Sequence, residues 1–234
     1  MAMLYLSQLT IDGRCREARR DLSDCHALHE RVLHAFPDAS EITAARDHYG
    51  VLYRVESLDG GARILVQSRE RPDWTRLPAG YLRESAPEAK RIDGAYARIS
   101  QGQELVFRLR ANPTRRISSR NTGEDARWHG KRVEVRREED QLAWLRRKGE
   151  GAGFQILTVR TATAERSDVP DIRVSEGAHQ VTGKHNGHDL RFGSVLFEGR
   201  LRVTDADAFR RALESGIGSG KAFGFGLLSV APVP

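Results

Sequence analysis

The sequence is poor in cysteine, in aromatic residues and in long apolar runs. Cys15 and Cys25 are the only cysteines among 234 residues, too few for a disulfide framework or a four-cysteine zinc site. No apolar run approaches the roughly 18–20 residues that a membrane-spanning helix needs. The opening MAMLYLSQLTID lacks the basic start of a signal peptide and is typical of a strand. We therefore expect a globular protein of the reducing cytoplasm.

Positive charge is what the chain has in excess. It carries 38 lysines and arginines against 32 acidic residues, a formal net charge of +6. Arginine dominates, and its planar guanidinium matches the geometry of phosphate. The composition therefore favours a polyanionic partner. A solvated surface encoded by a GC-rich genome would give the same excess, and composition alone does not separate the two.

The spacing of apolar residues predicts two similar α+β units in tandem. The first half is expected to contain a strand over 4–11, a helix capped by Ser23 or Asp24, a hairpin joined by LDGG, an irregular stretch and a strand over 102–113. This order fits a ferredoxin-like βαββαβ unit with a degraded second helix. The second half reads helix, strand, loop, strand, helix, strand. We place the first domain at 1–112, a basic linker at 113–130 and the second domain at 131–234.

A glycine-rich stretch near the C-terminus, GIGSGKAFGFGLLSVAP, at first suggests a phosphate-binding loop. The Walker A pattern fails, because Lys221 is followed by alanine and the loop leads from a helix into a strand. What remains is a loop whose backbone, at Gly218 and Gly220, can approach a large partner closely, with Lys221 as a point charge. The alternative is a helix C-cap followed by a tight strand entry.

Two histidines stand three residues apart in HALHE. His26 and His29 are neighbours on one helix face. Their spacing matches no zinc motif, but it suits acid–base catalysis, including RNA transesterification. The alternative, a histidine half-buried on an amphipathic helix, is the one that spacing alone favours.

Basic residues gather at two further places. The strand RLRANP and the stretch after it carry Arg108, Arg110, Arg115 and Arg116, a candidate nucleic-acid groove or simply an exposed strand face. The stretch HQVTGKHNGHD has the composition of a hairpin with basic tips, which would enter an RNA groove or stand in solvent.

Six stretches together resemble a known family. They occur along the chain in the order LYLSQLTI, RRDLSDCHALHERVLHAFP, LVFRLRANPTRR, LAWLRRKGEGAGF, VLFEGRLRVTD and GIGSGKAFGFGLLSVAP. The same order is found in the CasE (Cse3) family, the CRISPR repeat-processing endoribonucleases of the type I-E Cascade system. The resemblance covers nearly the whole chain, and FRLRANP and the glycine-rich motif are its most specific parts.

The resemblance implies a fold, a substrate and a reaction. The fold would be two tandem ferredoxin-like (RRM-like) βαββαβ domains that bind the stem-loop of CRISPR repeat RNA. The precursor transcript would be cut once at the 3′ base of the stem, without metal or other cofactor. The 2′-hydroxyl would attack the scissile phosphate, giving a 2′,3′-cyclic phosphate and a 5′-hydroxyl. The mature guide RNA would then stay with the protein and the other Cascade subunits.

The resemblance also implies roles for single residues. His29 matches the family's catalytic histidine, a general acid or base. Some relatives carry a tyrosine three residues earlier, where this chain has His26, which would transfer a proton or only position phosphate. A basic hairpin around Lys184 to Arg191 would enter the RNA major groove. The arginines expected on stem phosphates are Arg108, Arg110, Arg115 and Arg116.

Two other functions stay open at this point. A subunit that binds repeat RNA without cutting it would keep the same fold and basic surface, and His26 would then mark lost activity. A metal-dependent hydrolase would use His26, His29 and a distant acid.

Overall fold

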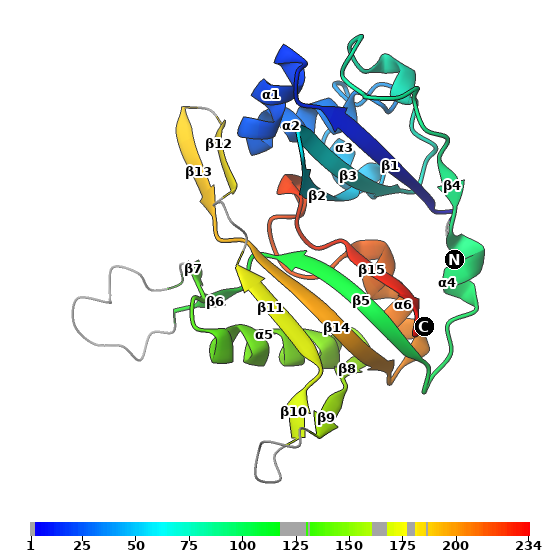
Figure 1. The fold of residues 1–234 in the computed structure, drawn as a ribbon, viewed down its shortest axis with the longest axis vertical. Coiled ribbons are helices and arrows are strands. Elements are labelled where there is room, and N and C mark those ends of the chain that lie inside the picture. The colour runs from blue at the N-terminus through cyan, green and yellow to red at the C-terminus, as the bar shows by residue number, and fades with distance from the viewer. Residues whose placement is uncertain (1–2, 118–129, 131, 161–167, 177–180, 186) are drawn as a thin grey trace, which may run out of the picture.

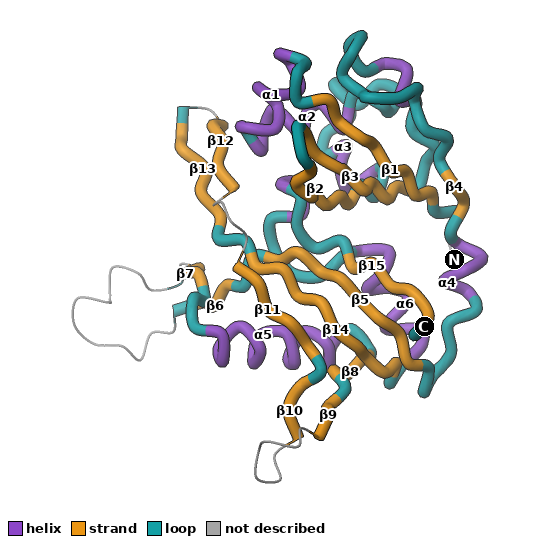
Figure 2. Tube along the Cα trace, viewed as in Figure 1, coloured by secondary structure: helices purple, strands orange, loops and turns teal. Residues whose placement is uncertain are grey.

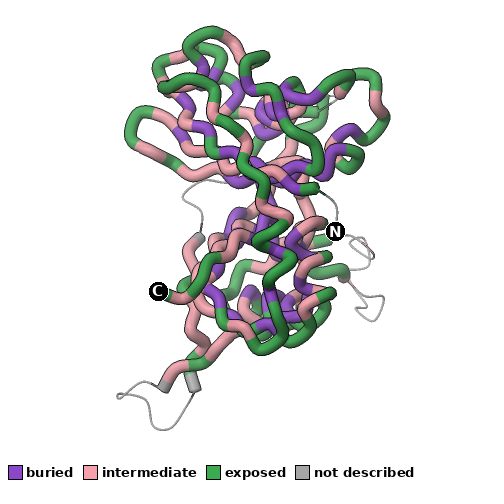
Figure 3. The backbone as a smooth tube through the Cα atoms, turned by 90° about the vertical axis from the view of Figure 1, so that its right-hand side faces the viewer, coloured by how far each residue is buried: buried purple, intermediate pink, exposed green. Residues whose placement is uncertain are grey.

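The structure is a computed structural model that describes residues 3–117, 130, 132–160, 168–176, 181–185 and 187–234. Its two larger sheets are antiparallel and lie one above the other in Figure 1, each with helices packed against it. Buried residues gather inside each half of the molecule (Figure 3). The fold is therefore of the mixed α and β class with antiparallel sheets. No helix in the described part of the chain is long and apolar enough to cross a membrane.

The first sheet is built from the N-terminal residues. Its strands lie in the order β2-β3-β1-β4, and every pair is antiparallel. The LDGG hairpin forms as expected, between β2 and β3. Apolar side chains of the strands, such as Ile64 and Tyr53, share a core with Leu28 and Val32 from the helical side. The strands and helices are β1 (Tyr5–Asp12), α1 (Arg16–Ser23), α2 (Cys25–Leu33), α3 (Ala45–His48), β2 (Leu52–Leu58), β3 (Gly61–Ser68), η1 (Trp74–Arg76), β4 (Lys90–Arg91) and α4 (Asp93–Ala97).

The second sheet has the order β11-β14-β5-β15, and β8 also pairs with β14. Helices α5 and α6 lie together on one face of it (Figure 2). Trp144 and Leu145 of α5 and Phe209 and Leu213 of α6 share a core with the strands. The elements are β5 (Glu104–Ala111), α5 (Glu138–Gly151), β8 (Phe154–Ile156), β11 (Ile172–Glu176), β14 (Val195–Val203), α6 (Ala206–Ser215), η3 (Lys221–Phe223) and β15 (Leu228–Pro232).

Three strand pairs project from the second sheet. They are β6 (Thr114–Arg116) with β7 (Arg132–Glu134), β9 (Thr158–Arg160) with β10 (Asp168–Pro170), and β12 (Val181–His185) with β13 (His188–Phe192). The pair β12–β13, hereafter the hairpin, rises toward α1 and α2 of the first half (Figure 1).

The structure places one strand differently from the sequence prediction. We expected residues 102–113 to close the first domain, within 1–112. Instead β5 is an inner strand of the second sheet, paired with β14 and β15. Its buried residues alternate along the strand, a pattern that would be the same in either sheet. Which sheet β5 joins therefore depends on its pairing with strands far away in the sequence. The short β4 takes the edge of the first sheet instead.

The expected linker at 113–130 is partly a strand. Residues 118–129 lie outside the described residues, but Thr114–Arg116 form β6 and pair with β7. The division into domains otherwise stays a prediction.

Buried polar contacts join the two halves. The hydroxyl of Tyr53 on β2 donates to the carbonyl of Ala222 in η3, at 2.8 Å. Gln67 of β3 donates to the carbonyl of Leu213 in α6, also at 2.8 Å. Both Tyr53 and Gln67 are fully buried. Because unpaired polar groups are costly when buried, these contacts hold the first sheet and the C-terminal elements in one relative position.

Candidate active site

Helix α2 carries both histidines that the sequence analysis singled out. Asp24 caps it, because its Oδ1 accepts the backbone N–H groups of His26, at 2.8 Å, and Ala27, at 3.2 Å. The cap fixes where the helix starts, so His26 lies in its first turn and His29 lies on the same face one turn later. Of the two caps expected from the sequence, Ser23 and Asp24, the structure uses Asp24.

His29 lies in a half-buried site beside an aromatic ring. Its ring meets Phe223 of η3 edge-on, with centroids 6.3 Å apart. Burial, together with the positive charges of His26 and Arg46, lowers the pKa of His29 to about 4. Its Nδ1 is buried and has no hydrogen-bond partner among the described residues. The imidazole is therefore neutral at pH 7.

His26 is in direct contact with the hairpin. Its Nε2 lies 2.5 Å from Nδ1 of His185, the last residue of β12. The two rings meet edge-on, with centroids 4.4 Å apart. The carboxylate of Glu30 is 4.0 Å from the same Nε2. When both rings are neutral, one nitrogen of the pair donates and the other accepts, so a proton at one ring affects the other.

The backbone of the hairpin also packs on the start of α2. The N–H of Lys184 donates to Oδ2 of Asp24, at 3.3 Å. A Cβ at Gly183 would lie 2.6 Å from Oδ1 of Asp24 and 2.8 Å from Sγ of Cys25. Only a residue without a side chain allows this approach. The hairpin therefore lies against the N-terminus of α2, with the side chains of Lys184 and Arg191 exposed.

The glycine-rich loop, with η3, packs against both α2 and the hairpin at this site. Phe223 stacks on Phe192 of β13 at a centroid distance of 4.9 Å, so η3 touches both the hairpin and His29. The glycines are used for close packing inside the protein: a Cβ at Gly220 would lie 2.9 Å from the ring of Phe225, and one at Gly218 would lie 3.1 Å from Trp144. This packing gives these glycines a role in the fold, and contact with a polyanion stays a prediction for them.

Lys221 is engaged at the end of α6. Its Nζ donates to the carbonyl of Ser215, at 2.6 Å. Burial lowers the pKa of Lys221, and the charges of Arg46 and Lys148 lower it further. The ammonium thus sits among other cations at a helix C-terminus, where backbone carbonyls favour positive charge.

The arginines of the candidate groove differ in their surroundings. Arg108 is held by two carboxylates, Glu56 at 2.9 Å and Glu198 at 2.5 Å. Arg110 donates to Ser194 Oγ at 3.2 Å, and burial lowers its pKa. It lines a cavity of about 400 Å³ between α2, β2 and the hairpin.

Arg115 and Arg116 lie on β6 with exposed side chains. Nε of Arg116 donates to the carbonyl of Gly130, at 3.1 Å. The structure therefore brings His26, His29 and Lys184 together. It engages Arg108 and Arg110 with neighbouring protein groups, and leaves the side chain of Arg115 exposed on β6.

Sequence reasoning missed three members of the site. His185, Phe192 and Phe223 come from β12, β13 and η3, and no local pattern relates them to α2. The stretch HQVTGKHNGHD pointed to a hairpin with basic tips, but not to the helix on which that hairpin packs. A sequence signal for the position of His185 would have been Gly183, two residues before it, because a glycine within a strand can mark a close approach of another backbone.

Other chemistry at the site is limited. Burial raises the pKa of the Cys25 thiol to about 11, so it is not a thiolate nucleophile at neutral pH. Among the described residues, no group of three or more histidine, cysteine or acidic side chains is arranged to hold a metal ion.

The chain matches known proteins over nearly its whole length. A model of the CRISPR associated protein family matches residues 4–232. The CRISPR-associated endoribonuclease Cse3 of Thermus thermophilus is 34% identical over 98% of this chain and 100% of that protein. The CRISPR system Cascade subunit CasE of Escherichia coli is 32% identical, with the same coverage.

Solved structures give the same result. The structure of Thermus thermophilus Cse3 bound to an RNA that represents a pre-cleavage complex has a TM-score of 0.76, at 33% identity, and the match covers 98% of this chain and 100% of that one. The Cas6e protein of Escherichia coli K-12 has a TM-score of 0.67, at 27% identity, with 98% and 100% covered. This chain therefore belongs to the family of CRISPR-associated proteins that includes Cse3 and CasE.

Proposed function

We propose that this chain is an endoribonuclease that binds the stem-loop of CRISPR repeat RNA and cuts the precursor transcript at the 3′ base of the stem. The observation that carries the proposal is the site on α2, where two histidines lie on one helix face between the hairpin and η3. The similarity to Cse3, an endoribonuclease with an RNA-bound structure, supports the same substrate class. The reaction needs no metal and no other cofactor.

The architecture that we propose for RNA binding and cleavage is a pair of ferredoxin-like domains. Two strand orders support it. In the first half the order β2-β3-β1-β4 is that of a βαββαβ unit, with η1 in the place of the second helix. In the second half β15, β5 and β14 lie side by side, with α5 and α6 as the two helices and β8 and β11 beside β14. The second unit begins at β5, earlier than residue 131.

The proposed reaction is a transesterification within the RNA. The 2′-oxygen next to the scissile phosphate attacks phosphorus and loses its proton, and the bond from phosphorus to the 5′-oxygen breaks. The leaving 5′-oxygen gains one proton, so the products are a 2′,3′-cyclic phosphate and a 5′-hydroxyl. His29, neutral at pH 7, accepts the 2′-proton or, once a nearby phosphate has raised its pKa, donates to the 5′-oxygen. His26, with His185 against it, supplies the other proton transfer.

Binding of the stem is proposed to use the basic residues around this site. Lys184 and Arg191 stand exposed on the hairpin that packs on α2, so an RNA groove placed there brings its backbone to His29. Arg115 and Arg116 extend the positive surface along β6. Because the A-form major groove is narrow, contacts to phosphate and shape dominate. Weaker roles fall to Arg108 and Arg110, which protein groups already hold, and to Gly218, Gly220 and Lys221.

The proposed partners follow from the family. CasE is named as a Cascade subunit, and we propose that this chain likewise stays with the mature guide RNA among other Cascade subunits, in the cytoplasm. The alternative, a subunit that binds repeat RNA without cutting it, predicts tight binding and no product.

The test compares wild type with His29→Ala on a repeat RNA in the presence of EDTA. Wild type is expected to cut, whereas His29→Ala binds equally well and cuts at least about 100-fold more slowly, since a positioned acid–base group contributes that much. Full cleavage by the variant would remove His29 from the mechanism. Binding without cleavage by wild type over a range of pH would support the alternative.

A further inference from the structure

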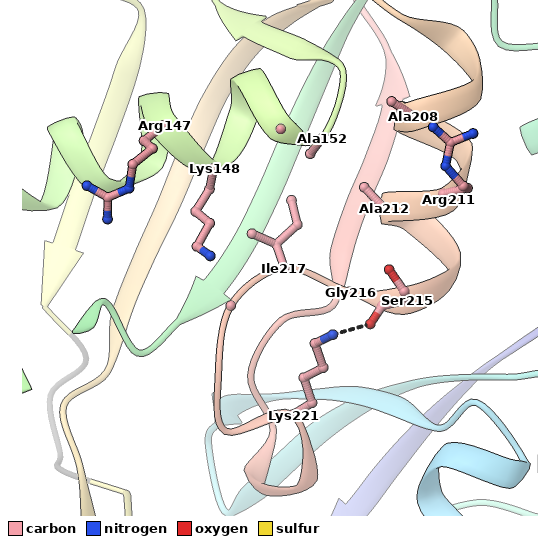
Figure 4. Close-up of a pocket in the computed structure, with 12 residues that line it drawn as sticks. Arg147, Lys148, Ala152, Ala208, Arg211, Ala212, Ser215, Gly216, Ile217 and Lys221 are labelled. Atoms are coloured by element: carbon pink, nitrogen blue, oxygen red, sulfur yellow. Dashed lines mark hydrogen bonds between the residues drawn. The ribbon is translucent and has the colours of Figure 1, made fainter. Parts of the chain in front are cut away.

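A cavity of about 550 Å³ lies on the helical side of the second sheet, away from the hairpin. It opens between the C-terminal ends of α5 and α6 and the glycine-rich loop (Figure 4). Its volume is within the range of about 300–1,000 Å³ that is usual for ligand pockets. Neither His26 nor His29 lines it, so it is a separate place on the molecule from the candidate active site.

The lining of the cavity is positively charged. Four cations contribute to it, namely Arg147, Lys148, Arg211 and Lys221. Among the lining residues that the structure describes there is no carboxylate; the others are glycines, alanines, one serine and one isoleucine. Small side chains form the floor and let a ligand approach the backbone. A cavity of this composition suits an anion rather than an apolar molecule.

Two of the four cations have their charge available. Arg147 and Arg211 are exposed, and neither makes a hydrogen bond or an ion pair with any residue in the described ranges. They come from α5 and from α6, on two different walls of the cavity (Figure 4). Lys148 lies over the ring of Trp144, 5.9 Å from its centroid. An anion in the cavity would therefore lie near two cations that no carboxylate of the described residues neutralises.

Positive charge continues from this cavity toward the candidate active site. Lys221 lines the cavity and is also the first residue of η3, whose Phe223 lies against His29. Arg46 is close enough to both that its charge lowers the pKa of Lys221 and of His29. Arg46 and Lys221 therefore continue the positive charge from α2 to the cavity, and a polyanionic strand that ran between the two places would be attracted along its length.

We propose that this cavity binds backbone phosphates of the single-stranded RNA on the 3′ side of the cut. The proposal rests on the proposed function, in which the scissile phosphate lies at the 3′ base of the stem. On the 5′ side of that phosphate the RNA is in the stem, so the strand that is free to continue past η3 is the 3′ flank. Arg147 and Arg211 hold this flank before cleavage, and the cut separates it from the stem.

The test uses two repeat RNAs, each with a 2′-deoxy nucleotide before the scissile phosphate so that binding is measured without cleavage. One ends just after the cut position and the other has a single-stranded 3′ flank. The variant is Arg147→Ala with Arg211→Ala. The matched control is Arg146→Ala, an exposed arginine of the same helix that lines a different cavity.

The double variant should bind the flanked RNA about tenfold more weakly, and the slope of log K against log salt should fall by about 1.4, as expected when two single-strand phosphates are no longer neutralised. The control should bind both RNAs as wild type does. Equal weakening on both RNAs, or no weakening on either, would overturn the proposal. The second result would point instead to an acidic protein partner for the cavity. If wild type failed to bind the RNA without the flank, the proposed function itself would fall.

Discussion

Nδ1 of His185 lies 2.5 Å from Nε2 of His26, although 159 residues separate the two along the chain. The contact joins the hairpin to the helix that carries His29. A hydrogen bond from the backbone N–H of Lys184 to the carboxylate of Asp24 strengthens the same junction. The element proposed to bind RNA and the element proposed to cut it are therefore one packed unit, and binding at the hairpin bears directly on the histidines.

The first prediction concerns this pair. His26→Ala and His185→Ala should each slow cleavage. Relative to wild type, the double variant should lose less than the product of the two single losses in rate. The expected coupling is about 1–2 kcal/mol, because the two rings share one hydrogen bond. Single-turnover cleavage rates of wild type, the two single variants and the double variant give this coupling energy as a double-mutant cycle. His188→Ala is the control, since His188 lies opposite His185 in the hairpin and should behave as wild type. Independent effects of the two histidines would contradict the pairing.

The second prediction concerns stability and pH. The pKa of His29 is about 4 in the folded protein and 6.5 in an unfolded chain. Between these values the unfolded state binds more protons, so stability is full above pH 6.5 and is lost as the pH falls toward 4. Allowing for partial exposure, the loss is about 2 kcal/mol. Urea unfolding of wild type and His29→Gln between pH 7 and pH 4.5 measures it. The variant should lose less stability, and parallel curves would show that His29 is not held neutral.

The third prediction compares Arg115 and Arg116, which make no ion pair among the described residues, with Arg108, which two carboxylates hold. Arg115→Ala with Arg116→Ala should weaken binding of the repeat stem and reduce the slope of log K against log salt by about 0.9 for each phosphate that is no longer neutralised. Arg108→Ala should change that slope less, because Glu56 and Glu198 already neutralise Arg108. It should instead lower the free energy of unfolding by about 1 kcal/mol, a modest cost for a half-exposed ion pair. Binding titrations at several salt concentrations measure both slopes. Equal slopes for the two variants would contradict the difference that we expect between Arg108 and the pair Arg115 and Arg116.

The fourth prediction concerns the end of α6. Gly216 has a φ of 75°, and a Cβ there would lie 2.8 Å from Cδ2 of Leu52 and 3.0 Å from the carbonyl of Gly226. Gly80 has a similar φ of 74° with nothing within 4 Å of a Cβ. Gly80→Ala should therefore cost about 1 kcal/mol from backbone strain alone, and Gly216→Ala about 1–2 kcal/mol more from crowding. Chemical unfolding of both variants compares them, and equal losses would mean that the loop does not pack against β2.

Local signals in the sequence predicted some of the elements, but not α1 or β11. Ser23 or Asp24 before an apolar helical pattern placed α2, and LDGG placed the β2–β3 turn, because caps and turns depend on residues within a few positions. The place of β5 was wrong, since alternation describes a strand but not the sheet that it joins.

The site was predicted only in part, for the same reason. His26 and His29 were found because their spacing lies within one helix. His185 and Phe223 were not, since they reach α2 through tertiary packing. The arginines were found by type, but the sequence did not show that Glu56 and Glu198 hold Arg108.

Cleavage of an RNA that lacks one 2′-hydroxyl tests the proposed mechanism most directly. Wild type is incubated with repeat RNA, either unmodified or with a 2′-deoxy nucleotide just before the scissile phosphate. The mechanism predicts that both RNAs bind equally, that only the unmodified RNA is cut, and that its products end in a 2′,3′-cyclic phosphate and a 5′-hydroxyl. Cleavage of the deoxy RNA, or a product with a 5′-phosphate, would mean that water attacks instead and would contradict it.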